Sequence, residues 1–119
     1  MNKIKNTKKY DLEGRTFEFA KRCRDYVKKL PKTLSNIEYG KQLIRSSGSQ
    51  ASNYIEANES LSKKDFIMRA KICRKEAKES RLWLSLSEPE ETNLKGKEKL
   101  IQEALELTKI FGSIVENSK

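Results

Sequence analysis

The chain has 119 residues, of which 35% are apolar and 36% are charged, and it contains two cysteines and no histidine. A domain of this length buries about two-thirds of its unfolded surface, and a lean apolar content under a heavily charged surface favours a helical bundle over a β-sandwich. The lack of histidine removes the commonest general base and the commonest metal ligand. We therefore expect no metal site, no cofactor and no enzymatic activity.

The net charge of +9 is unevenly distributed. Residues 1–45 carry 13 Lys and Arg against 5 Asp and Glu, and residues 63–81 carry 8 against 3, so these segments have charges of +8 and +5. Such a field favours polyanionic partners, although lysine-rich surfaces also simply keep small proteins soluble. A membrane span would need about 18 consecutive apolar residues, and a signal peptide would need an apolar core. The sequence has neither, which predicts a cytoplasmic protein without membrane contact.

Residues 1–10 are basic and aperiodic, and we expect a flexible arm there, followed by a single domain over residues 11–119. Asp11 is the expected cap of the first helix, which Pro31 terminates. Phe17 lies off the apolar stripe of this helix. The stripe itself contains Phe19, Ala20, Cys23, Tyr26, Val27 and Leu30.

The second helix is expected to start after a cap at Ser35 or Asn36 and to run to a polar turn at residues 60–62. Serine and glycine at positions 46–49 weaken it, since a glycine inside a helix costs about 1 kcal/mol relative to alanine. We predict a continuous helix because the core-facing pattern keeps its phase on both sides; the alternative is two short helices around a serine loop. The pattern comprises Gly40, Ile44, Ser47, Ala51, Tyr54 and Asn58.

The third helix is expected to follow a cap at Ser62 and to end near Ser87, before an acidic loop at residues 88–94. Its core-facing stripe is Phe66, Ala70, Cys73, Ala77, Ser80 and Leu84. A fourth helix follows with the same spacing in Leu100, Ile101, Ala104, Leu107, Thr108, Phe111, Ile114 and Val115. The sequence thus predicts an all-α fold, an antiparallel up-down-up-down four-helix bundle.

More apolar side chains are present than one bundle needs to close its core. Monomers rarely leave such residues contiguous on the surface, and interfaces are rich in aromatic residues. We therefore expect a homo-oligomer whose interface includes Phe17, Met68, Ile72, Trp83 and Leu86. Cys23 and Cys73 are interpreted as small buried apolar residues.

Basic residues recur at helical spacing on the first and third helices. Such ridges can follow the phosphates of a nucleic acid, but they also resemble any solvated helix face, and the interleaved Glu76 and Glu79 dilute the field. The candidate nucleic-acid-binding residues are Arg15, Arg22, Lys29, Lys71, Arg74, Lys75, Lys78 and Arg81.

Polar residues also lie beside the apolar stripes of the second and third helices. Buried charges persist only when they are paired or hydrogen-bonded, so we expect a structural polar network formed by Arg45, Ser49, Asn53, Glu56 and Glu79. The alternative is that Glu56 and Glu79 form a catalytic carboxylate pair in an open pocket. No catalytic signature or phosphate-binding loop accompanies them.

The segment from Gln42 to Ala57 resembles the family of small bacterial four-helix bundles first noticed as reading frames within intervening sequences of 23S ribosomal RNA genes. The family pattern Q-L-x-R-A-A-x-S-I-x-x-N-I-A-E-G is matched in register by Gln42, Leu43, Arg45, Ser49, Asn53 and Glu56. Its departures from the pattern include Ser46, Ser47, Gln50 and Ala57.

This resemblance implies a bundle that assembles as a homopentameric, barrel-like ring. A related branch, the accessory proteins of diversity-generating retroelements, binds a reverse transcriptase and nucleic acid through a basic surface. The function predicted from the sequence is a non-catalytic oligomeric module that associates with RNA or DNA, structured RNA in particular. The alternative is a homo-oligomeric scaffold that binds a protein partner and has no nucleic-acid role.

Overall fold

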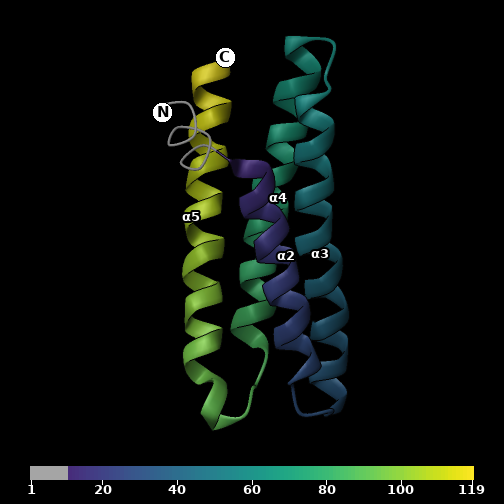
Figure 1. Ribbon diagram of the computed structural model, residues 1–119, viewed down its shortest axis with the longest axis vertical. Helices are drawn as coiled ribbons and strands as arrows, with labels where there is room; N and C mark the ends of the chain where they lie inside the picture. Colours follow the sequence, from purple (N-terminus) through teal and green to yellow (C-terminus); the bar gives the residue numbers. More distant parts are fainter. Residues whose placement is uncertain (1–10) are drawn as a thin grey trace.

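The computed structural model describes residues 11–119, and these residues form four long α-helices and no strand. The helices are α2 (Leu12–Lys28), α3 (Leu34–Asn58), α4 (Lys63–Leu86) and α5 (Leu94–Ser118), and a short 3₁₀ turn, η1 (Glu91–Asn93), precedes α5. They run antiparallel along the long axis of the molecule (Figure 1). The predicted all-α four-helix bundle is confirmed; the predicted N-terminal arm lies outside the described residues.

Each helix packs against its neighbours in the chain, and α5 closes the bundle by packing against α2. Within residues 11–119, the backbones of α2 and α4 do not lie side by side, so these two helices occupy opposite corners of the bundle. The α2–α3 and α4–α5 connections lie at one end, and the α3–α4 turn and the C-terminus lie at the other (Figure 1). No described helix has the combination of length and apolar character needed to span a bilayer.

One core cluster takes side chains from all four helices. The predicted core faces of the first, third and fourth helices are confirmed, since these helices bury Phe19, Cys23, Tyr26, Ala70, Cys73, Ala77, Leu84, Leu100, Ala104, Leu107, Phe111 and Val115. Tyr54 of α3 packs edge-on against Phe111 of α5, with the ring centroids 5.5 Å apart. The aromatic pair joins the two helices that lie across the bundle from each other.

The predicted core face of α3 is partly wrong. Ile44 and Asn58 are exposed, and Leu43 and Gln50, which the prediction placed off the face, are buried instead. The buried sector is wide because α3 packs against α2 on one side and α4 on the other. Serine and glutamine occupy much of that sector, so hydrophobicity alone could not locate its centre.

The helix ends show which cap predictions were correct. Asp11 accepts a hydrogen bond from the Gly14 amide at 2.8 Å, and Ser62 accepts one from the Asp65 amide at 3.1 Å, as predicted. The cap of α3 is Thr33, not Ser35 or Asn36. Asn36 is buried, and its side chain binds the carbonyl oxygens of Pro31 and Glu88 and the Glu88 amide. It thereby ties the α2–α3 loop to the α4–α5 loop.

The serine-rich centre of α3 is helical without a break, as predicted. Ser46 and Ser47 are buried, and their hydroxyl groups donate to the carbonyl oxygens of Leu43 and Ile44. The Ser46 hydroxyl also lies 2.8 Å from the Ser80 hydroxyl of α4. Small hydroxylated residues therefore satisfy their own polar groups while they let α3 and α4 approach each other closely.

Candidate functional site

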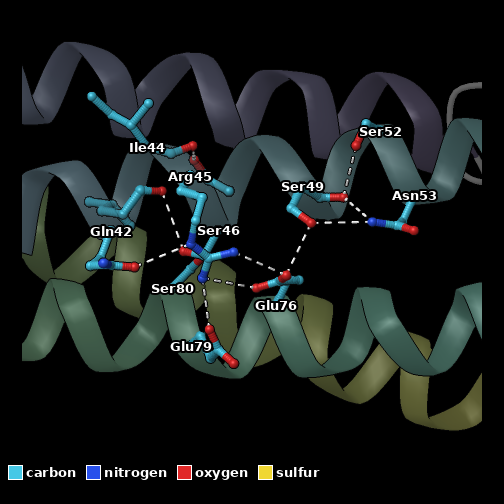
Figure 2. A network of polar contacts seen from close by, with 12 residues as sticks. Gln42, Ile44, Arg45, Ser46, Ser49, Ser52, Asn53, Glu76, Glu79 and Ser80 are labelled. Atoms are coloured by element: carbon cyan, nitrogen blue, oxygen red, sulfur yellow. Dashed lines mark hydrogen bonds and ion pairs between the residues drawn. The ribbon is translucent and has the colours of Figure 1, made fainter.

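A network of polar side chains joins the facing surfaces of α3 and α4 (Figure 2). The Arg45 guanidinium of α3 contacts the Glu76 carboxylate at 3.3 Å and the Glu79 carboxylate at 2.9 Å, both on α4. The Ser49 hydroxyl donates to the same Glu76 carboxylate at 3.0 Å. The hydrogen bonds to Glu76 are the main cause of the raised pKa of Arg45, so this guanidinium is charged whenever the protein is folded.

The network continues along the helix pair in both directions. The Asn53 side chain donates to Ser49 and accepts a 2.8 Å hydrogen bond from the Arg69 guanidinium of α4. At the other end, Arg45 donates to the side-chain oxygen of Gln42. The carboxylates of α4 are therefore held by α3 and fix the relative position of the two helices.

Of the predicted network, the structure brings together Arg45, Ser49, Asn53 and Glu79 and leaves Glu56 outside it. Glu56 is exposed, and its carboxylate makes no hydrogen bond within the described residues. Glu76 takes the place expected for Glu56, with a side chain that is only 6% exposed. The sequence prediction missed Glu76 because Glu76 was counted among the lysines of the solvated face. One signal was available: Glu76 lies one helical turn before Ser80, which belongs to the core-facing stripe.

The structure does not bring Glu56 and Glu79 together as a carboxylate pair. Glu79 lies opposite Arg45, which precedes Glu56 by 11 residues on α3, or roughly 16 Å along the helix axis. Burial raises the pKa of the Cys23 and Cys73 thiols to about 12, so both thiols are protonated at neutral pH. Among residues 11–119, no cluster of carboxylate, thiol or imidazole groups could hold a metal ion.

The predicted cations of α4 form a ridge on its outer side. Lys71, Lys75, Lys78 and Arg81 are exposed, and the aliphatic part of the half-buried Arg74 lies near Gly112 of α5. None of the five makes an ion pair within the described part of the chain. Glu76 and Glu79, which the sequence placed among these cations, turn toward α3 and bind Arg45. The positive field of the ridge is therefore less diluted than the sequence suggested.

The predicted cations of α2 are arranged differently. The Arg15 guanidinium is occupied, because it binds the Glu103 and Glu106 carboxylates of α5 at 2.8 Å each, and these hydrogen bonds raise its pKa. It is thus a structural residue that docks α2 on α5. Arg22 and Lys29 are exposed and line a small hollow beside α5. Since α2 and α4 occupy opposite corners, the eight predicted cations do not form one surface on a single subunit.

The predicted interface residues differ in their exposure. Phe17 is 61% exposed, and Met68 and Leu86 are also exposed, whereas Ile72 is half-buried. Trp83 packs against the core and stacks on Tyr39 of α3, with ring centroids 6.0 Å apart. Trp83 therefore belongs to the contact between α3 and α4 and not to the exposed apolar surface.

The chain is similar to a known protein family and to a solved structure. The sequence profile of the 23S rRNA-intervening sequence protein family matches residues 8–113. The fold is similar to the crystal structure of a protein of unknown function from the S23 ribosomal protein family of Bacteroides thetaiotaomicron, with 28% sequence identity and a TM-score of 0.74 over 87% of this chain and 96% of that chain. No curated protein matches the sequence. The match over nearly the whole bundle shows that this chain belongs to the 23S rRNA-intervening sequence protein family.

Proposed function

We propose that this protein is a non-catalytic helical module that associates with nucleic acid, structured RNA in particular, through the basic ridge of α4. The observation that carries the proposal is the separation of charges on this helix. Lys71, Lys75 and Lys78 lie on its outer side, while Glu76 and Glu79 are bound by Arg45 on the side facing α3. A cationic ridge of this kind suits the phosphates of a duplex.

The chemistry of the ridge favours backbone contacts over base recognition. Single-stranded RNA is usually bound by stacking its bases on exposed aromatic side chains. The ridge carries lysine and arginine and no aromatic residue, since Trp83 is stacked on Tyr39 and Phe66 is half-buried. Binding should therefore depend on the shape and charge of the nucleic acid and not on its sequence.

Self-assembly is the second part of the proposal. One subunit offers a small number of phosphate contacts. Several subunits in a ring would present several ridges to one RNA, and the family resemblance implies a homopentameric ring. Linked binding sites raise the apparent affinity well above that of each site alone. Exposed apolar side chains such as Phe17, Met68 and Leu86 support an oligomer because they leave surface for another subunit to cover.

Fluorescence anisotropy with a labelled RNA hairpin of about 20 base pairs tests the nucleic-acid part, and binding should be strongest near 50 mM salt. Lys71→Glu/Lys78→Glu should weaken binding and lower the slope of log K against log salt by roughly 1.4–1.8, since each of the two lost phosphate contacts lowers this slope by roughly 0.7–0.9. Lys95→Glu/Lys109→Glu is the matched control, because it removes the same charge from exposed positions of α5. Equal binding by the two variants, or no binding by the unmodified protein, would refute the proposal.

A further inference from the structure

The first helix of the bundle is shorter than the other three. α2 has 17 residues, whereas α3, α4 and α5 have 25, 24 and 25. A shortfall of this size corresponds to roughly 11 Å of helix. It lies at the end that holds the α3–α4 turn and the C-terminus, because α2 and α3 are joined by a short loop at the opposite end (Figure 1). Within residues 11–119, one corner of the bundle therefore has no helix at this end.

The ion pairs between α2 and α5 show how far α5 extends past α2. Arg15 of α2 binds Glu103 and Glu106 of α5, so these residues lie at the same level. From this level only three residues of α2 remain toward the open corner, whereas twelve residues of α5 remain. Ile114 lies in the part of α5 that has no partner on α2, and it is only half-buried.

A hollow with a volume of about 570 Å³ lies at this corner. Its apolar lining comes from Leu12, Tyr54, Ile110 and Ile114. The two isoleucines are half-buried, so part of each side chain stays open to a further contact. Asp11 also lines the hollow. The hollow therefore adjoins the point at which residues 1–10 join the bundle.

Two carboxylates without an ionic partner lie at the same corner. Asp11 accepts a hydrogen bond from the Gly14 amide, and Glu13 accepts one from the Asn58 side chain, but neither makes an ion pair within residues 11–119. The charge of the nearby Arg15 is already matched by two glutamates of α5. The carbonyl end of α5 adds partial negative charge. The corner thus suits a segment that is cationic and carries apolar side chains.

The segment that precedes Asp11 has this composition. Residues 1–10 contain four lysines and no acidic residue, and their apolar side chains include Ile4 and Tyr10. Ten residues exceed the shortfall of α2, and Tyr10 is bonded directly to Asp11, which lines the hollow. A segment tethered beside its site is present there at a high effective concentration. Even a weak contact would therefore be populated.

We propose that residues 1–10 dock on this hollow of their own subunit, with the Tyr10 ring against Ile114 and the lysines beside Asp11 and Glu13. The segment then completes the corner that α2 leaves open, and it belongs to the folded domain in place of the flexible arm that the sequence predicts. The proposal involves neither the basic ridge of α4 nor self-assembly, so it stands apart from the proposed function.

Digestion with a lysine-specific protease tests the proposal. Its sites in the segment are Lys3, Lys5, Lys8 and Lys9, and mass spectrometry of the remaining chain separates these cuts from cleavage of the bundle. A peptide of residues 1–12 gives the rate for the undocked segment. Cleavage of a docked segment proceeds through its released state, so the segment in the protein should be cut about tenfold or more slowly than the peptide. Equal rates would overturn the proposal.

A variant that fills the hollow should remove the protection. Ser113→Arg/Asn117→Arg places two bulky cations at exposed positions of α5 that line the hollow, and arginine is a good helix former. This variant should stay helical by circular dichroism while its segment is cut at the peptide rate. Thr92→Arg/Gln102→Arg is the control, because it adds the same charge at exposed positions outside the hollow. Equal protection of the two variants would place the segment elsewhere and refute the proposed site.

A change in the segment itself provides a test that leaves the bundle intact. Tyr10→Ser should lose most of the protection, measured against a peptide with the same change, because the ring that packs on Ile114 is gone. Asn2→Ser is the control and should keep it. Protection that survives Tyr10→Ser would show that the apolar contact is wrong.

Dilution distinguishes the segment of the same subunit from that of a second copy. Docking within one subunit does not depend on protein concentration, because the segment is linked to its site. The cleavage rate should therefore be unchanged on about a hundredfold dilution, and a rate that rises toward that of the peptide would show that another copy supplies the segment. Lys71→Glu/Lys78→Glu should leave the protection unchanged, so this proposal and nucleic-acid binding fail or succeed separately.

Discussion

Arg45 of α3 holds the buried carboxylate of Glu76 of α4, with 3.3 Å between guanidinium nitrogen and carboxylate oxygen. The Glu76 side chain is 6% exposed, while the Arg45 side chain is about half exposed. Glu76 therefore depends on Arg45 and Ser49 for its polar contacts, since water does not reach it freely. The relationship is asymmetric: the arginine can return to water if the pair is broken, and the glutamate cannot.

This asymmetry leads to a prediction about two glutamates. Glu76→Ala should lower the free energy of unfolding by about 2 kcal/mol, because it removes a buried acceptor from Ser49 and leaves a void between α3 and α4. Glu56→Ala, at the exposed position that the sequence pattern had favoured, should change it by less than about 0.5 kcal/mol. Urea unfolding followed by circular dichroism measures both, and equal midpoints would show that Glu76 contributes no more than a surface residue.

Two glycines of α3 should respond to alanine in opposite directions. A Cβ atom at Gly40 would lie 2.9 Å from Cγ1 of Val27 on α2, and a β-branched side chain has little freedom to move away. Gly40→Ala should therefore cost about 1 kcal/mol of stability even after the gain in helix propensity. Gly48→Ala should add about 1 kcal/mol, since it meets open space. Thermal unfolding of the two variants compares them directly, and a stabilised Gly40→Ala protein would show that α2 can move away from α3.

The sequence predicts the fold well and the polar site less well, for physical reasons. Three of the four helices have apolar stripes of regular spacing, so periodicity locates their core faces. On α3 the buried positions include serine and glutamine, which carry no hydrophobic signal, and the exposed Ile44 carries a strong one. Glu56 fits a family pattern and Glu76 lies in a lysine-rich segment; only the rotation of α4 against α3 decides which of them is buried.

The two cysteines should be shielded in the folded protein. Burial raises the pKa of both thiols from 9.0 to about 12, so the folded state keeps these protons up to higher pH than the unfolded state. Between pH 9 and 12 the unfolded state binds fewer protons, and stability must fall as pH rises through this window. The loss should begin above pH 9, since below it the thiols are protonated in both states.

Two measurements check the cysteine prediction. A thiol reagent should modify Cys23 and Cys73 in urea and leave them unmodified in the native protein at neutral pH. Urea unfolding at pH 8 and at pH 10 measures the stability that each protein loses between the two pH values. This loss should be smaller for Cys23→Ala/Cys73→Ala than for the unmodified chain, because lysines titrate in both proteins but the two thiols titrate only in the unmodified chain. A thiol that reacts rapidly in the native protein would contradict the burial on which the argument depends.

The last prediction concerns Gln50, whose side chain is fully buried at the centre of α3. Neither its amide nitrogen nor its side-chain oxygen has a hydrogen-bond partner within the described residues. An unpaired buried polar group costs about 1–3 kcal/mol, and methionine fills a similar volume without that cost. Gln50→Met should therefore raise the free energy of unfolding by about 1–2 kcal/mol. Ser46→Ala is the contrasting variant: it removes a buried hydroxyl that is paired with Ser80, and it should lower stability. If Gln50→Met destabilises the protein as Ser46→Ala does, the Gln50 amide has a partner in solution, such as an ordered water in the core.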